Sequence, residues 1–158
     1  FAFDPLLRRL LVLAPHQADH RKTWPGESNC LKTLDQALSD FTELRAGPDG
    51  LLSLRCIRLG RDQDTLFRSS RSWVSLTPYR ATRHAKASSA TAALVADILL
   101  ECARARLPRP EVEVLDWRAE SRQGLSGRLR LRFAVAVPGP VILGRTRQLG
   151  GGLFAAEL

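Results

Sequence analysis

The segment Gly127–Val137, with the sequence G-R-L-R-L-R-F-A-V-A-V, carries the clearest structural pattern in the chain. Its side chains alternate with a period of two, as they do along a β-strand. One face would hold Leu129, Leu131, Phe133, Val135 and Val137, and the other Arg128, Arg130, Arg132, Ala134 and Ala136. The pattern predicts a strand with one face in a core and a row of three guanidinium groups on the other.

The arginine row has two interpretations. Antiparallel sheets commonly leave one face in water, so Arg128, Arg130 and Arg132 could simply be solvated. No acidic residue stands between them, however, and like charges in register repel one another. A phosphate backbone would supply the counter-anions. This favours a sheet face that binds nucleic acid.

The charge of the whole chain supports the same interpretation. The net charge is +8, and 21 of the 24 basic residues are Arg. Residues 65–96 hold five basic residues and no acid, and residues 117–158 hold seven Arg against two Glu. Arg binds phosphate bidentately and stacks on bases. Such segregation is typical of a nucleic-acid-binding protein, although an acidic protein partner or a merely solvated face would give a similar pattern.

The elements around this strand predict an α+β protein. A strand or short helical turns over 6–13 precede a loop at 15–26 and an amphipathic helix at 31–41. Strands follow at 51–59 and 72–79. A helix then begins at Ser88 and Ser89, carries Ala92, Val95, Leu99 and Cys102 on one face and is stopped at 107–110, and a strand follows at 111–115. The order β-α-β-β-α-β is that of a ferredoxin-like, RRM-like domain, here with extra C-terminal strands and a glycine-rich loop. Residues 1–50 would form its N-terminal strand, loop and helix, and residues 51–158 an RNA-binding core.

Composition excludes several classes of protein. With 158 residues and 44% hydrophobic residues, the chain can bury one core, and its apolar runs are too short to span a membrane. It begins with Phe1, lacks Met and shows no signal peptide, so we expect a fragment or processed chain of a cytoplasmic protein. Three widely spaced cysteines suggest buried, reduced thiols rather than disulfides or zinc ligands. His16 and His20 fall in the predicted loop, so we expect no metal and no other cofactor.

The C-terminal loop G-R-T-R-Q-L-G-G-G, residues 144–152, is the first candidate site. Glycine allows positive φ and a close approach of the backbone to a ligand, and two arginines make the loop basic. The loop lacks the Lys-Ser/Thr end of a P-loop. It is either a glycine-rich hairpin or an RNA-backbone site. The candidate RNA-binding residues are Gly144, Arg145, Arg147, Gln148, Gly150, Gly151 and Gly152, together with the arginine row.

The second candidate site is the segment W-V-S-L-T-P-Y-R-A-T-R-H-A-K, residues 73–86. RNA cleavage without metal needs an acid or base near the 2′-hydroxyl and the leaving oxygen, and cations for the charge on phosphorus. Tyr79, Arg83, His84 and Lys86 are residue types that perform these tasks. A surface histidine in a basic segment is the simpler alternative.

These motifs resemble the RAMP superfamily of CRISPR-associated proteins. Residues 73–86, the segment E-C-A-R-A-R-L-P-R-P-E-V-E-V at 101–114 and G-P-V-I-L-G-R-T-R-Q-L-G-G-G-L-F at 139–154 look like the C-terminal, repeat-processing endoribonuclease part of the fused RAMP subunit of type I-U (I-G) systems. The resemblance covers roughly residues 51–158.

The resemblance implies a protein that binds the repeat hairpin of a CRISPR precursor transcript and cleaves it without metal. It would stay with the guide RNA and other subunits of an effector complex. His84 would be the general acid or base, Tyr79 a positioning group, and Arg83 and Lys86 phosphate ligands. The alternatives are a non-catalytic RNA-binding subunit of the same complex and a basic adaptor for an acidic protein.

Overall fold

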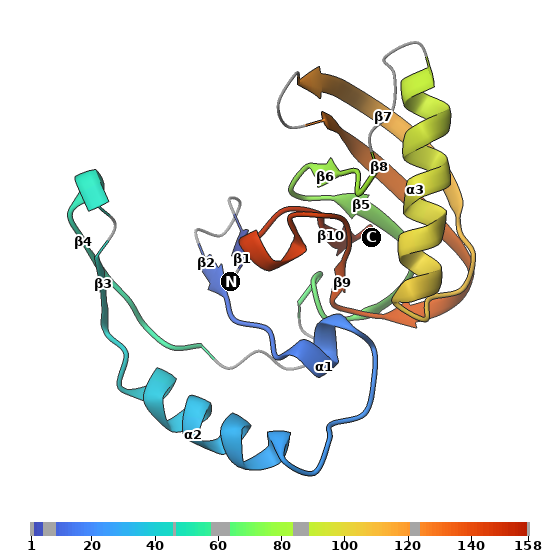
Figure 1. Cartoon of the computed structure of the whole chain (residues 1–158). Coiled ribbons are helices and arrows are strands. Elements are labelled where there is room, and N and C mark those ends of the chain that lie inside the picture. The colour runs from blue at the N-terminus through green and yellow to red at the C-terminus, as the bar shows by residue number, and fades with distance from the viewer. Residues whose placement is uncertain are drawn as a thin grey trace. The chain divides into compact units, whose positions relative to one another are not determined.

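The computed structural model describes residues 2–4, 9–45, 47–57, 64–83, 89–120 and 124–157. The chain is of mixed α+β type and divides into two compact units (Figure 1). The first unit comprises residues 1–20 and 60–158, and the second comprises residues 21–59. The predicted boundary between residues 50 and 51 falls inside a hairpin of the second unit. We describe each unit by itself.

The first unit is built on an antiparallel sheet. Its strands are β5 (Ser69–Ser75), β6 (Tyr79–Arg80), β7 (Glu111–Glu120), β8 (Gly124–Pro138), β9 (Val141–Ile142) and β10 (Leu153–Ala156). Strand β8 pairs with β5 and β6 along one edge and with β7 along the other. Strand β10 pairs with the outer edge of β5, and β9 pairs with β10. The predicted strand 72–79 is thus two strands, because the chain turns at Leu76–Pro78 between β5 and β6.

Strand β8 confirms the alternating pattern of Gly127–Val137 for most of its length. Leu129, Leu131 and Phe133 are buried, and Arg128 and Arg132 are exposed. Val135 was expected in the core but is 54% exposed. The reason is a bulge: two steps along β5, from Ser70 to Ser72, face five steps along β8, from Val137 to Arg132. Residues between these positions leave the regular ladder.

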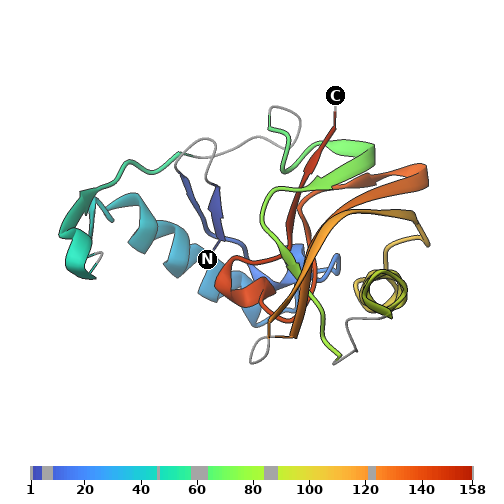
Figure 2. The ribbon, with the colours of Figure 1, turned by 90° about the horizontal axis from the view of Figure 1, so that it is seen from above.

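Helix α3 (Ala90–Arg104) covers one face of β7 and β8; Figure 2 looks down its axis. It confirms the predicted second helix, but of the four residues predicted on one face only Cys102 is buried. Ala92 is exposed and Val95 and Leu99 are only half-buried. The buried positions are Ala90, Leu94, Asp97, Ile98, Glu101 and Cys102. The apolar residues did not predict the buried face because that face includes two acidic residues, Asp97 and Glu101.

The N-terminal elements do not join the six-stranded sheet as the predicted β-α-β-β-α-β order requires. Strand β1 (Ala2–Asp4) pairs with β2 (Arg9–Leu11), and α1 (Pro15–Ala18) is a short helix inside the predicted loop. An ion pair of 2.5 Å joins Arg9 of β2 to Asp64. The predicted strand over 6–13 is therefore one arm of a separate hairpin.

The second unit contains the helix predicted at 31–41. Helix α2 spans Glu27–Ser39 and is followed by a hairpin of β3 (Glu43–Arg45) and β4 (Leu51–Ser53), with a 3-10 turn at Gly47–Asp49 between them. The predicted strand 51–59 is shorter, since residues 54–57 lie outside any strand. No residue of α2 is buried. Among the described helices, none is long and apolar enough to cross a membrane.

The cysteines differ from the prediction of buried thiols. Only Cys102, on α3, is buried, whereas Cys30 and Cys56 of the second unit are exposed. Burial, and to a lesser extent the charge of Glu101, raises the pKa of the Cys102 thiol to about 12. Cys102 is therefore an apolar core residue at neutral pH.

The glycine-rich loop connects β9 to β10 through a 3-10 turn at Arg147–Leu149. Gly152 adopts φ +67°, and a Cβ there would lie 1.8 Å from the carbonyl oxygen of Leu143. The Leu143 amide also donates a hydrogen bond of 2.9 Å to the Gly152 carbonyl. Gly152 therefore allows its backbone to lie close to that of Leu143, and not to a ligand.

Gly152→Ala is accordingly expected to destabilise the first unit by about 2–4 kcal/mol, since it combines a steric clash with an unfavourable φ. Urea unfolding measures the change. Gly26→Ala is the control, because Gly26 has a helical φ of −72° and nothing within 4 Å of its Cβ position. Equal midpoints for the two variants would contradict the close contact.

Candidate nucleic-acid interface

The structure brings the two candidate sites together. The amide of Arg145 donates to the carbonyl of Arg80 at 3.0 Å, and the amide of Gly152 donates to the carbonyl of Pro78 at 3.0 Å. The Thr77 hydroxyl donates to the Gly150 carbonyl at 2.9 Å and accepts from the Leu153 amide at the same distance. Hydrogen bonds thus join two segments that are more than sixty residues apart in sequence, which the sequence did not predict. We call residues 77–83 and 144–152 the junction.

Within the junction, the glycines contact protein rather than open space. Gly144 is buried at φ +94°, with its Cβ position 2.7 Å from the carbonyl oxygen of Arg80 and 2.8 Å from the ring of Tyr79. A Cβ on Gly151 would lie 2.1 Å from the hydroxyl of Thr146. Their conformations serve the packing of the loop, so they do not by themselves indicate a ligand. Gly150, at φ +87°, ends the 3-10 turn.

The exposed residues of the loop lie at its tip. Arg145, Gln148 and Leu149 are exposed. Arg147 is half-buried and forms an ion pair of 3.3 Å with Asp19. Arg147 and Asp19, together with Gln148, also line a cavity of about 210 Å³ whose other walls are apolar, formed by residues that include Leu11 and Ile142. Arg145 and Gln148 are therefore the predicted loop residues best placed to meet a partner.

Tyr79 does not occupy the surface position that its predicted role needs. Its side chain is fully buried, and its hydroxyl donates a hydrogen bond of 2.5 Å to Asp97. Burial, followed by the hydrogen bond to the Asp97 carboxylate, raises the pKa of Tyr79 far above its usual value. Tyr79 is the first residue of β6, and its ring belongs to the core cluster that includes Leu94 and Ile98 of α3. Tyr79 cannot contact an RNA bound at the surface.

The remaining catalytic candidates lie at the end of the same segment. Arg83 is exposed. The residue before it, Thr82, is anchored by two hydrogen bonds to Asp97, of 2.7 Å from its amide and 2.6 Å from its hydroxyl. His84 and Lys86 lie outside the described residues, so their predicted roles remain predictions.

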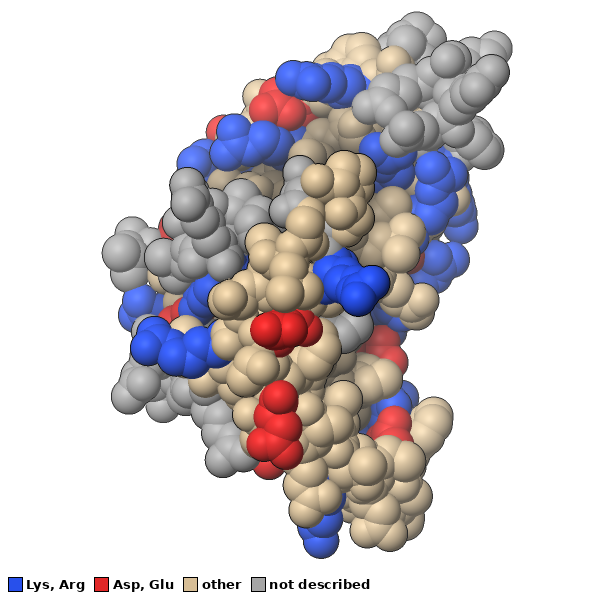
Figure 3. Space-filling view, turned by 90° about the vertical axis from the view of Figure 1, so that its left-hand side faces the viewer, with Lys and Arg blue, Asp and Glu red and all other residues tan. Residues whose placement is uncertain are grey.

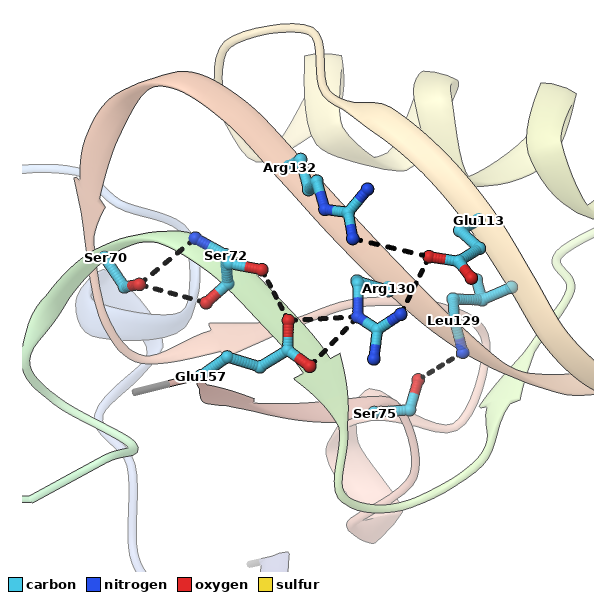
Figure 4. Close-up of polar contacts among 8 residues, drawn as sticks. All are labelled: Ser70, Ser72, Ser75, Glu113, Leu129, Arg130, Arg132 and Glu157. Carbon is cyan, nitrogen blue, oxygen red and sulfur yellow. Dashed lines mark hydrogen bonds and ion pairs between the residues drawn. The ribbon is translucent and has the colours of Figure 1, made fainter.

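The arginines of β8 have carboxylate partners within the protein, and Figure 4 shows those of Arg130 and Arg132. Arg130 pairs with Glu113 at 2.8 Å and with Glu157 at 2.9 Å. Arg132 lies 3.8 Å from Glu113, and Arg128 lies 3.9 Å from Asp116. The argument that the row needs an external counter-anion was therefore wrong. The neighbouring strand and the C-terminus supply the acids.

Of these acids, Glu113 could have been found in the sequence. In E-V-E-V-L-D, residues 111–116, glutamates alternate with valines, so Glu111 and Glu113 share one strand face. Strict alternation would put Asp116 on the other face, and a register shift between Val114 and Asp116 brings it opposite Arg128. The register sets Glu111 opposite Arg132, Glu113 opposite Arg130 and Asp116 opposite Arg128. Glu157 carries no such signal, because it reaches Arg130 only through the pairing of β10 with β5. On the face drawn in Figure 3, acidic and basic side chains are also interspersed.

His16 and His20 do not form a metal site by helical spacing. Helix α1 ends at Ala18, and His20 follows it with φ +48°, so the two rings do not share a helix face. The buried atoms His16 Nδ1 and His20 Nε2 have no hydrogen-bond partner in the described structure. Burial lowers the pKa of His20 against the opposing effects of a backbone hydrogen bond to Pro140 and the charge of Asp19. Within the described ranges, no three His, Cys, Asp or Glu residues are placed to hold a metal ion.

Comparison with known proteins gives no assignment. No protein-family model, no curated protein and no solved structure matches this chain.

The Arg130 network predicts a pH-dependent contribution to stability. The hydrogen bond of 2.5 Å from the Ser72 hydroxyl is the main cause that lowers the pKa of Glu157, and Arg130 adds to it, while partial burial opposes it. A carboxyl whose pKa is lowered by folding stabilises the folded state at pH values above its pKa of 4.5 in the unfolded chain. That contribution is lost as the pH falls through 4.5 and then through the lower pKa of the folded protein.

Glu157→Gln is therefore expected to lower the free energy of unfolding by about 1 kcal/mol at pH 7, with the difference closing below about pH 4. Denaturant unfolding of both proteins at a series of pH values measures it. Glu43→Gln, at an exposed site on β3, is the control for replacing a surface carboxylate at pH 7. A constant Glu157→Gln effect down to pH 3 would contradict the network.

Proposed function

We propose that this chain binds the repeat hairpin of a CRISPR precursor RNA through the junction, as a RAMP-type subunit of an effector complex. The observation that carries the proposal is that two of the three motifs of the family resemblance adjoin in space, joined by hydrogen bonds between residues 77–80 and 145–153. A complex of this kind works in the cytoplasm.

The sheet is compatible with the ferredoxin-like frame of such proteins. In a split β-α-β unit, two strands joined by a helix flank a third strand. Here β5 and β7 are joined through α3 and flank β8, and β10 adds to the outer edge of β5. The β9 strand and the glycine loop stand where the second helix of that frame would be. We therefore propose a ferredoxin-like domain whose first strand is β5 rather than residues 6–13.

The charges at the junction suit a phosphate ligand. Residues 65–96 contain five basic residues and no acid, and the loop 144–152 contains two arginines and no acid. Arg83 and Arg145 are exposed on its two segments. The arginines of β8 have carboxylate partners at 2.8 to 3.9 Å. Exposed cations on both segments of the junction would attract the phosphates of an RNA that crosses it.

The binding proposal predicts that replacing Arg83 and Arg145 together by Ala weakens repeat-hairpin binding and flattens its salt dependence. Each lost phosphate contact should reduce the log–log salt slope by about 0.7–0.9. Fluorescence anisotropy at several salt concentrations measures both quantities. The matched control replaces Arg109 and Arg118, which are exposed elsewhere on the same unit. If both double variants bind alike, the junction is not the site, and if the unmutated chain binds no RNA, an acidic protein partner becomes the better interpretation.

Cleavage is the second step of the proposal and depends on His84. General acid–base catalysis contributes about 10²- to 10⁴-fold, so His84→Ala should slow cleavage by that factor and leave hairpin affinity nearly unchanged. Lys86→Ala should reduce both, since its charge would contact phosphate before and during reaction. Activity should persist in EDTA.

Single-turnover cleavage of a repeat-hairpin RNA tests these expectations, with His16→Ala and His20→Ala as matched controls. Loss of activity only in a control variant would move the catalytic group to the N-terminal segment. Binding without cleavage by the unmutated chain would leave the non-catalytic RNA-binding subunit.

A further inference from the structure

Two acidic side chains of α3 are buried beneath the junction. Asp97 and Glu101 are 3% and 7% exposed and stand one helical turn apart on the same face. Removing a carboxylate from water is costly unless donors replace the lost hydration. The hydrogen bonds that these two residues accept therefore show which chain segments they hold.

Asp97 holds the first segment of the junction. It accepts hydrogen bonds from the Tyr79 hydroxyl at 2.5 Å, the Thr82 amide at 2.7 Å and the Thr82 hydroxyl at 2.6 Å. Three donors converge on its two oxygens. Two of them belong to Thr82, the residue before Arg83. Thr82 lies beyond the end of β6, where no sheet ladder fixes the backbone.

Glu101 holds the second segment. Its Oε2 accepts from the Gly144 amide at 3.3 Å, and its Oε1 accepts from Arg104 at 2.7 Å. Gly144 is confined between Arg80 and Tyr79, and it precedes Arg145. One face of one helix thus anchors the backbone immediately before each of the two exposed arginines.

We propose that Asp97 and Glu101 are positioning residues of the RNA site: they fix the spacing between Arg83 and Arg145 by anchoring Thr82 and Gly144 to α3. This inference rests on the proposed function. Neither carboxylate reaches the surface, so neither contacts RNA itself. They act by fixing the backbone. The phosphates of a bound RNA then meet two arginines at a fixed separation, and less conformational entropy is lost on binding than with two arginines that move independently.

The alternative is that the two acids only stabilise the core, and the two roles have different consequences. A purely structural acid affects RNA binding no more than any other core substitution of equal stability cost. A positioning acid affects binding in the intact fold, and its effect depends on Arg83. Cys102 provides the comparison, because it is fully buried on the same helix face, and no hydrogen bond of its side chain to the junction is present among the described contacts.

The test uses Asp97→Asn, which leaves one oxygen to serve three donors, and Thr82→Val, which removes one donor at nearly constant volume. Thr82→Ser keeps the hydroxyl and should restore the unmutated behaviour. Cys102→Ala is the stability control. Amide hydrogen exchange of Thr82 is measured without RNA, and repeat-hairpin affinity is measured well below the unfolding temperature of every variant.

We expect Asp97→Asn and Thr82→Val to speed amide exchange at position 82 and to weaken RNA binding, each on the order of 10-fold. Cys102→Ala should change neither. In the Asp97→Asn background, Arg83→Ala should cost less affinity than in the unmutated chain, because the arginine is no longer held in place.

Three results separate the outcomes. If the unmutated chain binds RNA but Asp97→Asn behaves like Cys102→Ala, the positioning role is overturned while the proposed function stands. Additive effects of Asp97→Asn and Arg83→Ala would also overturn it. If the unmutated chain binds no RNA, the proposed function fails, and unchanged Thr82 exchange in Asp97→Asn would show separately that the anchor is absent.

Discussion

Strand β8 is the constraint on which the first unit depends, because both of its edges and both of its faces are committed. It pairs with β7 along one edge and with β5 and β6 along the other. Leu129 and Leu131 face α3, while Arg130 faces the acids of its neighbours. A shift of one residue would exchange these faces and bury the guanidinium groups without partners. The register of every neighbouring strand is therefore fixed through β8.

The ion pairs on the open face of the sheet determine where the excess positive charge is available. Because Glu113, Asp116 and Glu157 neutralise the arginines of β8, that face attracts anions less than its sequence suggests. The junction combines two sequence segments without acids. The charge of the sheet face therefore depends on acids from other segments and does not follow from the number of arginines on β8.

Helix α3 shows why part of the candidate site could not be read from periodicity. Its buried face contains Asp97 and Glu101, which a search for apolar residues at helical spacing rejects. They are buried because Thr82, Tyr79 and the Gly144 amide supply donors, and all of these come from distant segments. The burial of Tyr79 has the same cause. Its hydroxyl donates to the buried Asp97, and the sequence around Tyr79 does not indicate this partner.

The sequence by itself determined the α+β class, the strand at β8, the helices α2 and α3, and the two motifs that make up the junction. These are local properties, fixed by side-chain period, by glycine and proline, and by charge along the chain. Tertiary structure alone decided that the two motifs adjoin, that Tyr79 is buried and that Val135 leaves the core at a bulge. It also placed the first predicted helix and strand 51–53 in a separate unit. Each of these depends on which strands pair and which donors meet which acceptors, and such contacts between residues far apart in sequence leave no periodic trace in it.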